Sequence, residues 1–357
     1  MNGLLPYLIA LFLSFGIVCA VHPYLVRFAL KRGIVDNPNA RKLNRVPVPV
    51  LGGVGVFLGF IVALYFVTSI LHILLPGTYV VVLLLMVGVG FIDDLYDLKP
   101  GTKFAVQIVA VLLLYYTCGL RIDNLHGILG VYELPMVISL PLTLVACVGV
   151  INSLNLIDGI DGLSSGYGIV AASLFSVWAC IQGGSVDLLI PCSLIGALIP
   201  FFIYNVFGKR NKMFMGDAGS YLLGIIFCIM ALNVLDSTSY RADVEATLIP
   251  FVFAVFAHPV LDTLRVMIMR ICRGCSPFKA DKTHLHHALV ERGLSHLLTT
   301  LIIIGLNLLV VIAWFICYKN HLSATIQLLV TIVVAMSCVV LPYPILAKNN
   351  RHCNACL

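Results

Sequence analysis

Acidic side chains whose spacing could support chemistry occur where long apolar stretches of the sequence end. The first group is Asp93, Asp94 and Asp97. If the preceding apolar stretch is a helix, Asp93 and Asp97 lie one turn apart on the same face. Carboxylates this close repel one another, and Mg2+ would relieve the repulsion while leaving positions open for substrate phosphates. The group is therefore predicted to be catalytic, and a solvated helix end is the simpler alternative.

A second polar group follows another apolar stretch, in residues 152–163. Asn152, Asn155, Asp158 and Asp161 recur every three residues, so their side chains could line one side of a cavity at the membrane surface. Two Asp-Gly steps in this segment favour a turn. A turn does not account for the two asparagines, because amides so close to hydrocarbon need polar partners. Asp158 and Asp161 are predicted to be catalytic, and the asparagines to bind substrate.

A third acidic residue, Asp217, is flanked by glycines in residues 215–220, where a new apolar stretch begins. One interpretation is that this aspartate is simply a helix N-cap, a position that Asp favours. Helix N-termini also attract anions, and glycines allow backbone amides to approach a phosphate. The segment alone leaves both interpretations open.

Histidines are concentrated in residues 276–287, which contain His284, His286 and His287. Basic residues lie close by in the sequence, at Arg270, Lys279 and Lys282. Imidazole can donate a hydrogen bond in its neutral or its protonated form. Contact with a diphosphate is the preferred interpretation, with metal ligation and an ordinary surface loop as alternatives.

The elements that must position these groups are membrane helices. The chain has 61% hydrophobic and 11% charged residues, whereas soluble domains have about 25% charged residues. A helical crossing needs about 20 apolar residues. Eleven spans are predicted, in residues 1–26, 46–92 (two spans, divided at 76–77), 104–120, 134–157, 162–186, 188–208, 218–235, 246–261, 293–318 and 320–347. The predicted fold is an all-α polytopic bundle.

The basic residues indicate the orientation of the bundle. With the N-terminus outside, all but three of the 22 Lys and Arg residues fall on the inner side, as the positive-inside rule requires. The exceptions are Arg121, Arg241 and Lys319. We expect a cytoplasmic C-terminus, a site on the cytoplasmic face, one catalytic membrane domain over residues 1–347 and a tail over 348–357. The loops are too short for a nucleic-acid surface.

These motifs, in this order, resemble one enzyme family. Residues 35–39, 41–42, 52–53, 93–97, 152–163, 215–220 and 276–287 are similar to polyprenyl-phosphate N-acetylhexosamine-1-phosphate transferases. The His-Leu-His-His form of the last motif favours the WecA/TagO branch over the MraY branch. One departure is Asn44, where this branch usually has a histidine.

The resemblance implies that undecaprenyl phosphate attacks the β-phosphate of a UDP-N-acetylhexosamine, with UDP-N-acetylglucosamine as the first choice of donor. UMP leaves, and the lipid-linked sugar diphosphate initiates a cell-envelope polysaccharide. The resemblance places the reaction in the bacterial cytoplasmic membrane and requires Mg2+, for which Mn2+ could substitute. It is compatible with a homodimer.

The same resemblance assigns roles to individual residues. Asp217 is the leading metal ligand and Asp94 the second candidate, while Asp93 orients or deprotonates the lipid phosphate. The substrate-binding residues are expected to be Lys42, Lys103, Asn152, Asn155, Asn205 and Arg270. The sequence leaves open whether the lipid phosphate attacks directly or through a covalent aspartyl intermediate.

Two other classes of protein are alternatives. A secondary transporter would use intramembrane acids to relay ions, although its sites tend toward the middle of the bilayer. A scaffold would use the inner basic loops only to hold anionic lipids. Within the enzyme class, other UDP-N-acetylhexosamine donors stay open.

Overall fold

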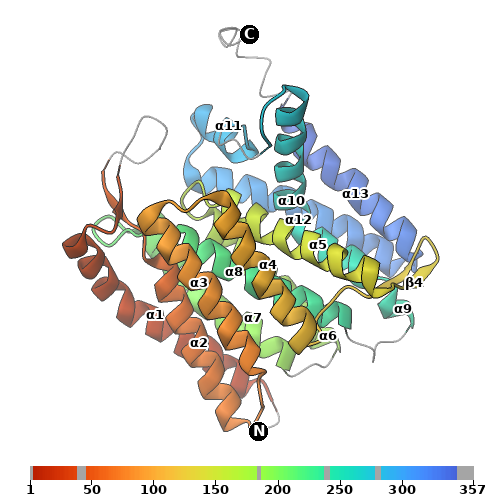
Figure 1. The fold of residues 1–357 in the computed structure, drawn as a ribbon, viewed down its shortest axis with the longest axis horizontal. Helices are drawn as coiled ribbons and strands as arrows, with labels where there is room; N and C mark the ends of the chain where they lie inside the picture. The colour runs from red at the N-terminus through yellow and green to blue at the C-terminus, as the bar shows by residue number, and fades with distance from the viewer. Residues whose placement is uncertain (1–2, 38–45, 183–185, 237–241, 278–282, 344–357) are drawn as a thin grey trace. The chain divides into compact units, whose positions relative to one another are not determined.

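Most of the described residues are helical (Figure 1). The computed structural model describes residues 3–37, 46–182, 186–236, 242–277 and 283–343. The chain divides into two compact units, one formed by residues 1–123 and 134–240, the other by 124–133 and 241–357. The prediction of a single catalytic domain over residues 1–347 concerns function as well as packing and stays a prediction, and the expected tail lies outside the described residues.

Within its described residues, the first unit has eight helices and one short strand pair. The helices are α1 (Leu5–Arg32), α2 (Gly52–Ile70), α3 (Gly77–Tyr96), α4 (Pro100–Thr117), α5 (Met136–Leu156), α6 (Leu163–Gln182), α7 (Val186–Phe207) and α8 (Gly216–Asp236). The antiparallel strands β1 (Val35–Asp36) and β2 (Val48–Pro49) pair between α1 and α2. An apolar helix satisfies its own backbone hydrogen bonds, which makes it the natural element for a membrane.

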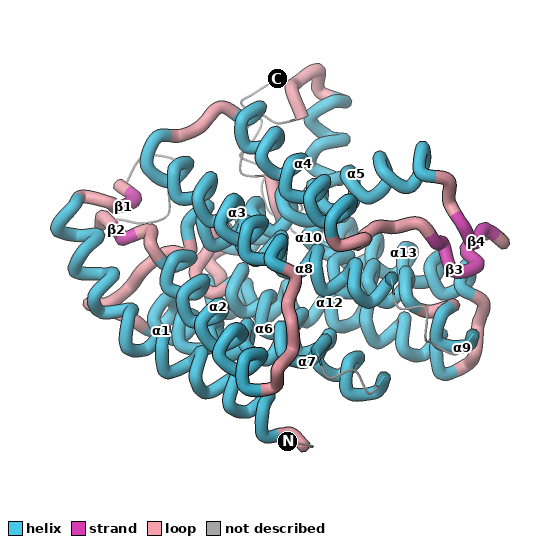
Figure 2. The backbone as a smooth tube through the Cα atoms, turned by 60° about the horizontal axis from the view of Figure 1, so that its bottom comes forward, coloured by secondary structure: helices cyan, strands magenta, loops and turns pink. Residues whose placement is uncertain are grey.

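Helix α8 is the central helix of this unit. Its neighbours are α2, α3, α5, α6 and α7, and Figure 2 shows it enclosed among them. In its most apolar window, 89% of the residues are buried. A helix that is apolar on all sides belongs inside a bundle, so whatever lies at the first turn of α8 is surrounded by the ends of other helices.

In the part of the second unit that the structure describes, three long helices are joined by several short elements. Its elements are β3 (Asn124–Ile128), β4 (Val131–Glu133), α9 (Ala242–Glu245), α10 (Leu248–Cys272), α11 (Leu285–Glu291), α12 (His296–Lys319) and α13 (Ala324–Val340). Buried polar side chains connect the long helices: Trp314 Nε1 donates to Thr247 Oγ1 over 2.8 Å, and that hydroxyl donates to Gln327 over 2.6 Å.

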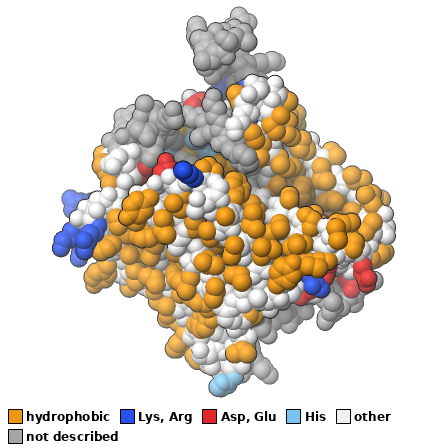
Figure 3. Space-filling model, viewed as in Figure 1, with side chains coloured by type: hydrophobic (Ala, Val, Ile, Leu, Met, Phe, Trp, Pro, Cys, Tyr) orange, Lys and Arg blue, Asp and Glu red, His pale blue; other side chains and the backbone are white. Residues whose placement is uncertain are grey.

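The structure confirms a polytopic all-α membrane protein. Nine helices of the described residues are long and apolar enough to cross a membrane. The other two predicted spans are also helical, but α13 has 17 residues and α4 has 18 with Lys103 in its first turn. Hydrophobic side chains cover most of the face shown in Figure 3, and charged ones occupy small areas of it. The orientation of the termini stays a prediction.

Candidate active site

Glycines allow α3 to approach the first turn of α8. Gly216 has φ = 72°, and a Cβ there would lie 2.6 Å from an oxygen of Asp94. A Cβ on Gly90 would lie 2.4 Å from a backbone nitrogen in the same turn. Real Cβ contacts are longer, so this packing depends on the absence of side chains at both positions. It brings the end of α3 against the start of α8.

Asp94 caps α8 from outside the helix. One of its oxygens accepts the amide N–H of Asp217 over 2.8 Å, and the other accepts that of Ala218 over 3.2 Å. A carboxylate is favoured here because the first amides of a helix have no partners within the helix. The side chain that caps α8 is therefore that of Asp94 and not, as the sequence allowed, that of Asp217. This leaves the side chain of Asp217 available for other contacts.

Asp93 is buried and paired with a cation. Lys103 Nζ lies 2.5 Å from its Oδ2, and the Leu98 amide donates to Oδ1 over 2.8 Å. The hydroxyl of Tyr221 on α8 donates to Oδ2 over 3.4 Å. A buried carboxylate needs such partners, since an unpaired charge is strongly unfavourable inside a protein. Three elements thus fix the position of Asp93.

Asp217 completes the carboxylate group. Its carboxyl lies within hydrogen-bonding reach of that of Asp93. Asn155 Nδ2 donates to Asp217 Oδ1 over 2.6 Å and to Ser220 Oγ over 2.8 Å. Two carboxylates this close require a shared proton or a cation between them. The structure therefore brings together Asp93, Asp94, Asn155 and Asp217, which come from three segments far apart in the sequence.

Asp158 lies in the turn between α5 and α6, near this group. Its carboxylate accepts a hydrogen bond from the Ser164 hydroxyl. Burial raises the pKa of the Asp158 carboxyl to about 7, and the charges of Asp94 and Asp161 add to the shift, while the bond from Ser164 opposes it. A carboxyl that titrates near neutral pH can exchange protons under ordinary conditions.

Asn205 joins the turn before α6 to the segment before α8. Its Oδ1 accepts the Gly162 amide N–H over 2.7 Å, and its Nδ2 donates to the Met213 carbonyl over 2.9 Å. Asp161 in the same turn pairs with Lys212 over 2.7 Å. These contacts give Asn205 a structural role, and its predicted contact with the nucleotide stays a prediction.

Asn152 makes its main contact with a residue that the sequence analysis missed. Asn152 Nδ2 donates to Gln107 Oε1 over 2.6 Å, and Gln107 is fully buried in α4. An amide within an apolar helix needs a polar partner, so the isolated glutamine was the available signal. Asp97 is exposed at the end of α3 with φ = 49°. Lys42 lies outside the described residues.

The second unit holds the histidines. His284 and His286 are buried, and the rings of His286 and His287 lie 4.1 Å apart. Burial lowers the pKa of the His286 ring well below its usual value, and the charges of the other two histidines lower it further. Arg270 donates to the Pro277 carbonyl over 2.6 Å.

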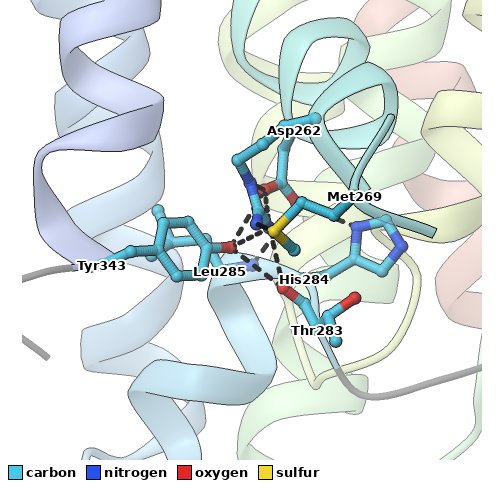
Figure 4. Close-up of polar contacts among 7 residues, drawn as sticks. Asp262, Met269, Thr283, His284, Leu285 and Tyr343 are labelled. Carbon is cyan, nitrogen blue, oxygen red and sulfur yellow. Dashed lines mark hydrogen bonds and ion pairs between the residues drawn. The ribbon is translucent and has the colours of Figure 1, made fainter. Parts of the chain in front are cut away.

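Asp262 is the acidic partner of the histidines and was missed in the sequence. Its Oδ2 lies 2.9 Å from His284 Nδ1 (Figure 4). The sequence placed it at the border of the span 246–261, whereas α10 continues to Cys272. Among the described residues, no group of three or more His, Cys, Asp or Glu side chains is arranged to hold a metal ion.

Fold and site together define a polytopic helical membrane protein with a carboxylate and amide site at helix ends. The family model of glycosyl transferase family 4 matches residues 77–235. The chain is 34% identical over 318 residues to the decaprenyl-phosphate N-acetylglucosaminephosphotransferase of Mycobacterium tuberculosis (strain ATCC 25618 / H37Rv), a match that covers 81% of this chain and 78% of the relative.

Two further relatives agree with this match. The chain is 30% identical over 302 residues to the probable undecaprenyl-phosphate N-acetylglucosaminyl 1-phosphate transferase of Bacillus subtilis (83% of this chain, 80% of the relative). It is 31% identical over 273 residues to the undecaprenyl-phosphate alpha-N-acetylglucosaminyl 1-phosphate transferase of Yersinia pestis (75% and 72%). The chain belongs to the polyprenyl-phosphate N-acetylglucosamine-phosphotransferases of glycosyl transferase family 4.

Proposed function

We propose that this protein transfers N-acetylglucosamine 1-phosphate from UDP-N-acetylglucosamine to undecaprenyl phosphate, giving a lipid-linked sugar diphosphate and UMP. The observation that carries the proposal is the meeting of Asp93, Asp94 and Asp217 with Lys103 at the first turn of α8. The reaction occurs at the cytoplasmic face of a bacterial cytoplasmic membrane, which the distribution of Lys and Arg supports.

The chemistry requires an anionic phosphate to attack another anionic phosphate. Catalysis of such a transfer consists mainly of neutralising charge and aligning the reacting atoms. Lys103 supplies a positive charge beside Asp93. A phosphate monoester has a second pKa of about 6, so the lipid phosphate is largely dianionic at neutral pH. Asp93 therefore orients the nucleophile more than it deprotonates it, and direct attack is the proposed route.

We propose that two of these carboxylates hold a magnesium ion together with the substrate phosphates. Asp93 and Asp217 lie within hydrogen-bonding reach of each other, and Mg2+ binds through one or two carboxylates together with substrate phosphates. We propose Asp217 as the leading ligand; both oxygens of Asp94 already accept helix amides, which makes Asp94 the weaker candidate. When bound, the ion supplies charge stabilisation for the diphosphate and the leaving UMP.

Both substrates are proposed partly from the relatives' names. The three relatives are named for N-acetylglucosamine, two of them for undecaprenyl phosphate and one for decaprenyl phosphate. Undecaprenyl phosphate is the acceptor that we propose here. Another UDP-N-acetylhexosamine would use the same carboxylates, because the phosphate chemistry does not depend on the sugar.

The test is a transfer assay with purified protein, undecaprenyl or decaprenyl phosphate, Mg2+ and a panel of labelled UDP-sugars. We expect label in organic-extractable lipid with UDP-N-acetylglucosamine, and its loss when EDTA replaces Mg2+. Equal turnover of a UDP-muramic acid pentapeptide donor would contradict the branch assignment. A transporter would give no lipid product, and a scaffold would give none that depends on Asp217.

A further inference from the structure

The carboxylate of Asp262 is divided between two sets of partners in the second unit. This acidic side chain lies within a membrane helix, α10, and is only 1% exposed. Its Oδ2 contacts His284 Nδ1 over 2.9 Å and accepts the Leu285 amide N–H over 3.3 Å. Its Oδ1 accepts hydrogen bonds from Arg265 over 3.0 Å and from the Tyr343 hydroxyl over 3.1 Å (Figure 4).

Arg265, the partner of Asp262 Oδ1, is itself held in place by further contacts. Arg265 also donates to the Thr283 carbonyl over 2.7 Å, and its guanidinium lies 3.8 Å from the centre of the Tyr343 ring. The positive charge of Arg265 balances the buried carboxylate. A group held from both sides presents a single acceptor oxygen to the His284 ring.

This arrangement determines which nitrogen of His284 can meet a ligand. An ionised carboxylate only accepts hydrogen bonds, so Nδ1 must carry the proton and Nε2 is the remaining ring nitrogen. Nε2 of His284 and Nε2 of His286 are buried and have no hydrogen-bond partner among the described residues. Leaving a buried polar atom without a partner is unfavourable. Two such atoms on neighbouring rings point to a ligand that supplies the missing partners.

We propose that Asp262 is a positioning residue: it keeps a proton on Nδ1 of His284 and fixes the ring orientation, so that the ring, protonated when the anionic substrate binds, donates its Nε2–H to a phosphate oxygen of the substrate. The identity of that ligand rests on the proposed transferase function. The contact between Asp262 and His284 does not. A merely structural Asp262 would join α10 to α11 and to Tyr343 without acting through the imidazole.

The first experiment reads the tautomer directly. Protein labelled with 15N-histidine is compared by NMR at pH 8.5 as wild type and Asp262→Asn, and His284→Gln identifies the resonance. We expect Nδ1–H in the wild type. In Asp262→Asn, Arg265 retains the amide oxygen, the amide nitrogen turns to His284, and the proton moves to Nε2. Tyr343→Phe, which keeps the carboxylate, should keep Nδ1–H. Nε2–H in the wild type, or no change in Asp262→Asn, would overturn the inference.

The second experiment is a double-mutant cycle in the transfer assay. Asp262→Asn should lower kcat/KM by about 10- to 100-fold. In a His284→Ala background the same change should have an effect of less than about threefold, because its effect passes through the ring. Additive losses would mean a structural role. If the wild type transfers nothing to lipid, the proposed function fails, and the NMR comparison still decides the role of Asp262.

Discussion

At the scale of single residues, the candidate site is defined by carboxyls that are too close to ionise independently. The carboxyls of Asp93 and Asp217 lie within hydrogen-bonding reach of each other. Those of Asp94 and Asp158 are close enough for the charge of one to affect the ionisation of the other. Such an arrangement is unfavourable for stability alone. The magnesium ion and the anionic substrate proposed above would offset this repulsion at the helix end.

Asp217→Asn tests this interpretation. The change keeps the shape of the side chain and removes one of the two carboxyls, those of Asp217 and Asp93, that repel each other when both are ionised. We expect transfer activity to fall by about 100-fold or more, while the midpoint of thermal unfolding in Mg2+-free detergent stays the same or rises. Asp123→Asn, at an ion pair with Arg121 away from the site, should leave activity unchanged. Loss of folding in Asp217→Asn would assign this carboxylate a structural role instead.

The raised pKa of Asp158 predicts a pH-dependent stability. Between its ordinary pKa of 3.8 and its folded value of about 7, the folded carboxyl holds a proton that the unfolded chain has lost. The free energy of unfolding therefore falls as the pH rises through this window, and the full loss is present above pH 7.

Asp158→Asn removes that loss, so it should raise stability relative to wild type more at pH 8 than at pH 5, by roughly 1–3 kcal/mol. Thermal unfolding at both pH values, with Asp123→Asn as control, measures it. An equal effect at pH 5 and pH 8 would contradict the shift.

At the scale of elements, the close approach of α3 to α8 determines the site. Gly90→Ala would place a Cβ against the first turn of α8. Overpacking of this kind costs about 1–3 kcal/mol, and it should also separate Asp94 from the amides that it caps. We expect lower thermal stability together with reduced activity.

Gly88→Ala is the matched control on the same helix. Apart from its chain neighbours and the backbone of its own helix, a Cβ at Gly88 would have no heavy atom within 4 Å, and alanine favours a helix by up to about 1 kcal/mol over glycine. Stability should stay the same or rise. Equal losses in both variants would mean that glycine matters for the flexibility of α3 and not for its contact with α8.

The sequence predicted the elements better than it predicted their contacts. Long apolar runs placed helices at all eleven predicted spans, because the membrane restricts which elements can exist. Dense groups such as Asp93 and Asp94 were found from their spacing. Gln107 was missed because it stands alone in an apolar run, and Asp262 because it lies at the border of a predicted span. Only the packed structure shows their partners. The cap formed by Asp94 likewise joins residues 123 positions apart.

At the scale of the whole molecule, the orientation in the membrane is the main open prediction. The distribution of basic residues places Lys99 inside and Arg121 outside. In a background with the 12 native cysteines replaced, a membrane-impermeant maleimide should label Arg121→Cys in intact cells. It should label Lys99→Cys only after permeabilisation. The reverse pattern would place the carboxylate site on the outer face and exclude a cytoplasmic nucleotide donor.

The cap on α8 also has a consequence for how the protein is made. A ribosome delivers α3 to the membrane long before it has synthesised the amides that Asp94 will hold. Until then the end of α3 presents two adjacent acids, Asp93 and Asp94, without the α8 partners that they have in the finished protein. A chain that stops before Gly216 therefore exposes two acids that lack their α8 partners. We expect cellular quality control to degrade it faster than a chain that includes α8.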